Sequence, residues 1–199
     1  MRVLLVGAGG ELGRAVSAAL VGRHEVVAAS RSGAEPVDIR DPASIAALYE
    51  RVGQVDAVAC AAGSVPFAPV GELSLEQVRA GVEDKLLGQI ALVRLGLDHV
   101  RDGGSITLIG GILADEPIRT GTVASAVNGG IHSYVAAAAV ELPRGIRINA
   151  VSPTVFVESW ESYGPFFPGF TPVPVAEAAR AYVRSIEGAS TGQVFRVGY

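Results

Sequence analysis

The amino-acid sequence predicts an α/β fold, built as an open, doubly wound parallel sheet of about seven strands with helices on both faces. Short apolar runs alternate along the chain with segments whose apolar residues recur at helical spacing. The 199 residues are 49% hydrophobic and 18% charged, which is enough apolar material for a hydrophobic core and rules out a disordered chain. No internal repeat, low-complexity tract or linker interrupts the alternation, so we expect residues 1–199 to form a single domain.

The elements follow from local patterns. Apolar runs predict strands at 3–6, 25–29, 55–60, 105–109, 146–151 and 193–197. A helix is expected from Leu12 to Leu20, and a second one opens at Asp41-Pro42, which has the pattern of an N-cap followed by proline. Ser74 to Gln77 forms a capping box that opens a long amphipathic helix over 75–100, ended by Gly103-Gly104. Two more helices are predicted over 120–142 and 175–186.

Composition and charge exclude several classes of function. Sixteen basic and 20 acidic side chains give a formal net charge of -4, and no cluster of basic residues marks a nucleic-acid surface. The single cysteine, Cys60, cannot form an internal disulfide, and no Cys/His cluster has the spacing of zinc ligands. No apolar run is long enough to cross a membrane. We therefore expect a cytoplasmic protein with no metal, no nucleic-acid partner and no membrane.

The first predicted strand runs into a glycine-rich turn at the start of the first predicted helix. Glycines at this place permit positive φ angles and let backbone N–H groups approach a phosphate at the helix N-terminus. The turn predicts a dinucleotide-binding Rossmann-type domain, although a tight turn without a ligand gives the same pattern. The residues expected to hold the cofactor here are Gly7, Gly9, Gly10, Glu11, Leu12 and Gly13.

The end of the second predicted strand carries Ser30-Arg31-Ser32. In a dinucleotide fold an acidic residue here selects NAD through the ribose 2′-hydroxyl, whereas a guanidinium flanked by two hydroxyls suits a 2′-phosphate. We therefore expect NADP to be preferred over NAD. The alternative is that Arg31 is only a solvated loop arginine.

Several blocks of the sequence resemble the short-chain dehydrogenase/reductase superfamily over the whole chain. They are Gly7-x-x-Gly10-x-x-Gly13, Asp38-Ile39, Cys60-Ala61-Ala62-Gly63, and the segment 141–153 that reads Glu-Leu-Pro-Arg-Gly-Ile-Arg-Ile-Asn-Ala-Val-Ser-Pro. The resemblance implies hydride transfer between a nicotinamide cofactor and a small carbonyl or alcohol substrate. It also implies cofactor contacts from Asp38, Ile39, Ala61, Ala62, Gly63, Asn128, Pro153 and Val155. A homodimer or homotetramer built on the helices over 75–100 and 120–142 is a further implication.

The sequence departs from that family at the residues that carry its chemistry. The Tyr-x-x-x-Lys pair falls at Ala124 and Asn128, so the phenol that donates a proton and the lysine that lowers its pKa are both missing. The family's serine falls at Gly110-Gly111. Its helix asparagine is replaced by Lys85, which is the chain's only lysine. We expect a short, atypical member with a non-standard active site.

Lys85 has two interpretations. It is either an exposed lysine beside the apolar face of its helix, or an ammonium in the catalytic cleft that donates a proton or holds an anionic oxygen. Thr122 and Ser125 flank the empty tyrosine position and are weaker catalytic candidates. Two functions therefore remain open, an NADP(H)-dependent oxidoreductase and a catalytically inactive NADP(H)-binding sensor or scaffold. A proton donor within reach of the cofactor distinguishes the enzyme from the sensor.

Overall fold

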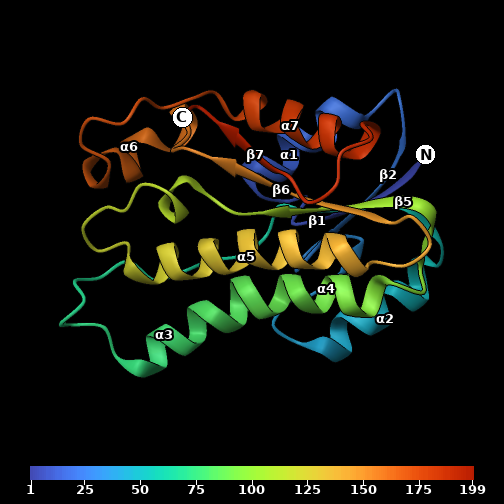
Figure 1. The fold of residues 1–199 in the computed structure, drawn as a ribbon, viewed down its shortest axis with the longest axis horizontal. Helices are drawn as coiled ribbons and strands as arrows, with labels where there is room; N and C mark the ends of the chain where they lie inside the picture. The colour runs from blue at the N-terminus through green and yellow to red at the C-terminus, as the bar shows by residue number, and fades with distance from the viewer.

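Seven parallel strands form one sheet in the computed structural model, which describes residues 1–199 (Figure 1). Their order across the sheet is β3-β2-β1-β4-β5-β6-β7. The strands are β1 (Arg2–Val6), β2 (Glu25–Ser30), β3 (Glu35–Pro36), β4 (Val55–Cys60), β5 (Val100–Ile109), β6 (Arg147–Pro153) and β7 (Val194–Val197). The order reverses between β1 and β4, and crevices for ligands form at such a switch point. The predicted α/β fold is confirmed.

Helices cover both faces of this sheet (Figure 1). On one face α1 (Glu11–Leu20) and α7 (Val175–Glu187) pack together, and on the other lie α2 (Pro42–Val52), α4 (Gly88–Gly96) and α5 (Thr122–Glu141). The rod that ends in α4 begins as α3 (Leu75–Gly81) and continues through one π-helical segment, η1 (Val82–Leu87), alongside α5. The short elements are η2 (Ile112–Ala114), η3 (Val157–Ser159), α6 (Trp160–Tyr163) and η4 (Gly164–Phe166).

Strand β1 shows why the sheet must be covered on both sides. Its side chains alternate, so Leu4 and Val6 pack under α2, α4 and α5, while Val3 and Leu5 pack under α1 and α7. All four are essentially fully buried. A continuous apolar run of this kind belongs to a strand of a parallel sheet whose two faces are both in the core.

The helix starts expected from the sequence are present. The Asp41 side chain accepts a hydrogen bond from the Ala43 N–H at 2.9 Å, with Pro42 in the first turn of α2. The Ser74 hydroxyl accepts from the Gln77 N–H at 3.1 Å, and the Gln77 side chain accepts from the Ser74 N–H at 2.9 Å. These bonds satisfy N–H groups that a helix leaves without partners at its start.

The end of the long helix was predicted wrongly. The helix stops at Gly96 instead of near residue 100, and Gly103-Gly104 lie inside β5, whose start was expected at residue 105. A Cβ at Gly96 would collide with the ring of Tyr49, so this glycine lets α4 lie against α2. A Cβ at Gly104 would lie 2.7 Å from the carbonyl oxygen of Asp56, next to the irregular pairing of β4 with β5. These glycines mark close packing, which local sequence does not reveal.

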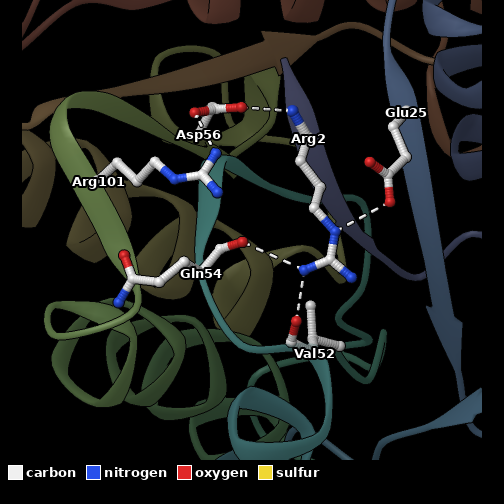
Figure 2. A network of polar contacts seen from close by, with 6 residues as sticks. All are labelled: Arg2, Glu25, Val52, Gln54, Asp56 and Arg101. Atoms are coloured by element: carbon white, nitrogen blue, oxygen red, sulfur yellow. Dashed lines mark hydrogen bonds and ion pairs between the residues drawn. The ribbon is translucent and has the colours of Figure 1, made fainter.

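A polar network closes the end of the sheet where the strands begin (Figure 2). The Arg2 guanidinium pairs with Glu25 at 2.9 Å, and Arg101 pairs with Asp56 at 2.8 Å. The backbone N–H of Arg2 also donates to Asp56, and the Arg2 guanidinium donates to the carbonyl oxygens of Val52 and Gln54 (Figure 2). A shallow hollow of about 570 Å³ lies here, but its charged side chains are already in ion pairs, Arg23 with Glu187 outside the lining, and it is at the opposite end of the strands from the switch-point crevice. We interpret it as structural.

Helix α5 is the one helix with the length and apolar composition to cross a membrane. Of its most apolar stretch, 39% is buried inside the molecule, against β6 and η1 among others. We therefore interpret it as a core helix of the α/β fold.

Gln89 joins α4 to the end of β5. Its side-chain amide donates to the Ile109 carbonyl at 3.0 Å and accepts from the Ile109 N–H at 2.8 Å, and the residue is completely buried. The pairing of β5 with β4 ends at Thr107, so the backbone of Ile109 has no strand partner on that side. Gln89 takes the place of the missing strand.

We expect Gln89→Leu to lower the free energy of unfolding by about 2–4 kcal/mol, because it leaves a buried N–H and a buried carbonyl without partners. Urea denaturation measures this. Gln54→Leu is the matched control, since Gln54 is exposed and its side chain makes a single bond, to the Asp98 carbonyl, and we expect a change of about 0.5 kcal/mol or less. Equal losses in the two variants would contradict the role given to Gln89.

Candidate active site

Two adjoining hollows open at the carboxyl ends of the central strands. The first, which we call the cofactor cleft, has a volume of about 550 Å³ and is lined by the glycine turn, by the ends of β2 and β4, and by residues 37–40. The second, the substrate cavity, has a volume of about 310 Å³ and is lined by segments that follow β4, β5 and β6. Both share Ala61, Ala62, Gly63 and Ser64. One elongated ligand can therefore reach from the cleft into the cavity.

The glycine turn has the shape that a phosphate needs. Gly7 has φ +87°, and a Cβ there would lie 2.7 Å from the backbone of Ala61. Gly9 and Gly10 line the cofactor cleft, and Gly10 is the N-cap of α1, so no side chain caps the first N–H groups of that helix. Gly13 does not line the cleft; it is glycine because a Cβ would collide with the Gly7 carbonyl oxygen. The uncapped helix N-terminus offers N–H donors and a partial positive charge to an anion.

The far end of the cofactor cleft is basic. Ser30, Arg31 and Ser32 all line it, and Arg31 makes no ion pair within the molecule. Asp38 also lines it, but the Arg40 guanidinium 2.6 Å away holds the pKa of this carboxyl down at about 2. The carboxylate is thus neutralised by its neighbour, so it opposes an anionic ligand less than its charge alone would. Arg40 was not among the residues singled out from the sequence.

Lys85 lies in the wall of the substrate cavity. It is only 9% exposed, so the interpretation as a surface lysine is wrong. Its ammonium donates one hydrogen bond to the Gly110 carbonyl at 2.9 Å and one to the Asn128 side-chain oxygen at 2.8 Å. The residue sits in η1, and π-helical turns of this kind recur at functional sites. The two positions that depart most from the family pattern are therefore in direct contact.

Burial lowers the pKa of Lys85 to about 8 from an ordinary 10.5. Desolvation disfavours the charged form, while the neighbouring Asp84 acts weakly in the opposite direction. An amine of this kind gains and loses its proton close to neutral pH, which an arginine cannot do.

Glycines surround the lysine because there is no room for side chains. A Cβ at Gly63, which has φ +132°, would lie 2.6 Å from Lys85 Cγ. At Gly110 it would lie 2.6 Å from His132 Nε2, and at Gly111 it would lie 2.8 Å from Asn128 Nδ2. The family's serine falls at Gly110-Gly111, where the side chains of His132 and Asn128 fill the space that the serine side chain would take. Its absence therefore accompanies the change at Asn128.

Most of the other predicted site residues lie in the two hollows. Ile39 lines the cofactor cleft, and Leu12, Ala124, Asn128, Pro153 and Val155 line the substrate cavity. Thr122 and Ser125 line neither: Thr122 is exposed in the first turn of α5, and the Ser125 hydroxyl is buried without a partner. Glu11 is outside the cleft as well. The roles predicted for these three residues stay predictions.

Cys60 and Tyr163 have different surroundings. Cys60 is completely buried at the end of β4, and burial raises the pKa of its thiol to about 12, so it is an inert apolar side chain. Tyr163, by contrast, lines the substrate cavity and faces Phe67, with ring centroids 6.3 Å apart. Phe67 had no signal in the sequence, because it follows β4 in an irregular segment.

The fold and the two hollows define a dinucleotide-binding protein of the Rossmann type. Residues 10–184 match the protein family described as enoyl-(acyl carrier protein) reductase, so the chain belongs to the short-chain dehydrogenase/reductase superfamily. The match places the chain in that family and does not by itself assign it an enoyl reductase activity.

Solved structures show the same fold. A crystal structure of a Listeria innocua protein is 47% identical and covers 99% of each chain with a TM-score of 0.97. A small-chain dehydrogenase in complex with NADPH is 25% identical, with a TM-score of 0.89 and coverage of 99% of this chain and 96% of the other.

Among curated proteins, an uncharacterized oxidoreductase of Methylorubrum extorquens is 30% identical over 110 residues, which are 55% of this chain. The chain spans about half the length of such relatives, 44% in that case.

We expect the side-chain ¹³Cε resonance of Lys85, which is unique because the chain has one lysine, to titrate near pH 8 by NMR. Asn128→Leu should lower that pKa further, because it removes an acceptor that stabilises the ammonium. Between pH 8 and 10.5 the unfolded chain binds the proton and the folded chain does not, so the free energy of unfolding should rise with pH across that window. A titration above pH 10 would show that Lys85 is solvated.

Proposed function

We propose that the protein is an NADP(H)-dependent oxidoreductase that interconverts a small carbonyl compound and its alcohol, with Lys85 in place of the family's tyrosine as proton donor. The observation that carries this proposal is the position of the Lys85 ammonium, buried in the wall of a cavity that adjoins the cofactor cleft. The sensor or scaffold alternative requires a cleft without a proton donor.

The cleft fits the cofactor at both ends. The glycine turn and the uncapped start of α1 would hold the pyrophosphate, and Ser30, Arg31 and Ser32 would hold the 2′-phosphate. A similar small-chain dehydrogenase has been solved with NADPH, which supports the choice of cofactor. Bound NADPH would supply the hydride.

The residues of this chain would supply the proton. An ammonium has three N–H donors, and the bonds to Gly110 and Asn128 use two of them, which leaves one for a substrate oxygen. These two acceptors fix the direction of the third N–H, so Asn128 acts as a positioning residue. With a pKa near 8, about nine lysines in ten carry the proton at pH 7, and the acid is strong enough to give it up to a developing alkoxide.

We also propose a cytoplasmic location, which the single, buried cysteine thiol favours. A homodimer or homotetramer would use the outer surface of the rod α3-η1-α4 and of α5, which lie side by side (Figure 1). Outward apolar side chains are present on both, with Leu87 50% exposed and Val140 88% exposed.

We expect Arg31→Ala to weaken NADPH binding by about 1.5–3 kcal/mol, because it removes a charge-assisted hydrogen bond to the 2′-phosphate. NADH lacks that phosphate, so its affinity should hardly change. Calorimetry with both cofactors measures the difference, and Arg79→Ala, at an exposed arginine outside both hollows, is the control. Equal affinity of the wild-type protein for NADPH and NADH would contradict the NADP preference.

We expect Lys85→Met to reduce carbonyl turnover by about 100- to 10,000-fold, the usual contribution of a positioned general acid. Lys85→Arg keeps the charge but cannot release its proton at neutral pH, so it should fail as well. Wild-type reduction should fall as pH rises through about 8, where the ammonium loses its proton. NADPH oxidation followed at 340 nm measures all three.

The triple variant Lys85→Asn with Ala124→Tyr and Asn128→Lys restores the family's asparagine, phenol and lysine together, so it should reduce carbonyls. Asn128→Lys without Lys85→Asn should not, because it removes an acceptor of Lys85 and places a second ammonium against it. Full activity of Lys85→Met would make Lys85 structural. If neither the wild type nor the triple variant reduces any carbonyl while both bind NADPH, the sensor interpretation replaces the enzyme.

A further inference from the structure

The substrate cavity holds a single cationic side chain and no anionic one. Its lining includes no aspartate, glutamate or arginine, and Lys85 and Tyr163 are its only ionisable side chains. A cationic substrate would lose its hydration without finding a carboxylate. A carboxylate would pair with Lys85 itself and occupy the N–H that the reacting oxygen needs. The cavity therefore suits an uncharged molecule.

Aromatic rings of two distant segments meet at the cavity, where Phe67 and Tyr163 belong to the lining and Phe166 packs against Phe67 from outside it. Phe67, which follows β4, lies 6.3 Å from the ring of Tyr163 in α6 and 6.1 Å from that of Phe166 in η4. The ring planes are inclined at 59° and 39°. Such tilted pairs present both ring edges and ring faces to a neighbour.

These rings differ from an ordinary core cluster in their exposure. Phe167, deeper in the same wall, is 6% exposed and packs edge-on against Phe170 at 5.4 Å. Tyr163 and Phe166 remain 46% and 42% exposed. When a flat apolar ligand covers aromatic surface that would otherwise stay in water next to a cavity, the free energy of the complex falls.

The size of the cavity limits the ligand further. Its volume of about 310 Å³ is at the lower end for a small-molecule site, and the nicotinamide ring would take part of it. The space that remains suits one ring or two fused rings.

We propose that the substrates are small, uncharged, planar carbonyl compounds, namely aromatic aldehydes or ring-conjugated ketones, and that Phe67 and Tyr163 are the residues that determine this specificity. This substrate class rests on the proposed oxidoreductase function. In the step, bound NADPH would supply the hydride to the carbonyl carbon, and Lys85 would give a proton to the oxygen. The products would be a benzylic alcohol, NADP⁺ and a neutral amine, which solvent reprotonates.

The test compares benzaldehyde with cyclohexanecarbaldehyde, which has the same carbon skeleton in a puckered ring, and with pyruvate, which is anionic. We expect kcat/KM for benzaldehyde to exceed that for cyclohexanecarbaldehyde by about tenfold and pyruvate to be inert. Phe67→Leu should lower the preference for the flat ring by about three- to tenfold, the usual scale of an aromatic pair. Tyr163→Leu should do the same, whereas Tyr163→Phe keeps the ring and should retain it.

A second measurement separates this proposal from the enzyme itself. Saturation-transfer NMR detects benzaldehyde bound to the NADP⁺-loaded protein, with Phe67→Leu as the comparison. Binding that the variant weakens, without turnover by the wild type, would support the aromatic site and contradict the oxidoreductase. Turnover of both aldehydes at equal efficiency would overturn the substrate class and leave the oxidoreductase intact. Absence of both binding and turnover of benzaldehyde would overturn the substrate class as well.

Discussion

The two hydrogen bonds of the Lys85 ammonium connect three parts of the sheet-and-helix framework. The lysine comes from η1, Gly110 follows β5, and Asn128 lies in α5. Taking an ammonium out of water is costly unless its donors find acceptors, so these contacts constrain everything around them. Gln89, one turn further along the same rod, holds the neighbouring Ile109 by both its N–H and its carbonyl. The end of β5 is thereby fixed where the lysine needs an acceptor.

This constraint makes sense of the other departures from the family pattern. In the family pattern the asparagine falls at the position of Lys85 and the lysine at the position of Asn128. In this chain the two side-chain types are exchanged between these positions. With the lysine on η1 and the amide on α5, the side chains of His132 and Asn128 occupy the space that a Cβ at Gly110 or Gly111 would take, so a larger residue there would have to displace them. Ala124 leaves the adjoining part of the cavity open. The changes at Lys85, Asn128 and Gly110-Gly111 are in direct contact with one another, which supports the proposal of a rearranged site.

The fold and much of the cofactor cleft could be predicted from sequence because they depend on local patterns. The apolar runs, the Asp41 and Ser74 caps and the glycine turn each act within a few residues. The role of Gly96 could not be predicted, because the close packing that requires a glycine there involves Tyr49, a residue of another helix. For the same reason, Phe67 carried no signal until Tyr163 and Phe166 were placed beside it. Lys85 was conspicuous as the only lysine, but its burial required the structure.

The π-helical segment η1 also sets the rotational phase of the rod. Each π-type turn accommodates one residue more than an α-turn, which rotates the following residues by roughly 100° about the helix axis. The capping box fixes the rotational phase of α3, and the burial of Leu92 and Val93 under the sheet fixes that of α4. The change from one phase to the other takes place within residues 82–87. The direction in which residue 85 projects is thus set by a count of residues as well as by its identity. If a homologue lacked one residue of this short segment and were otherwise identical there, it would present a different side chain to the cavity.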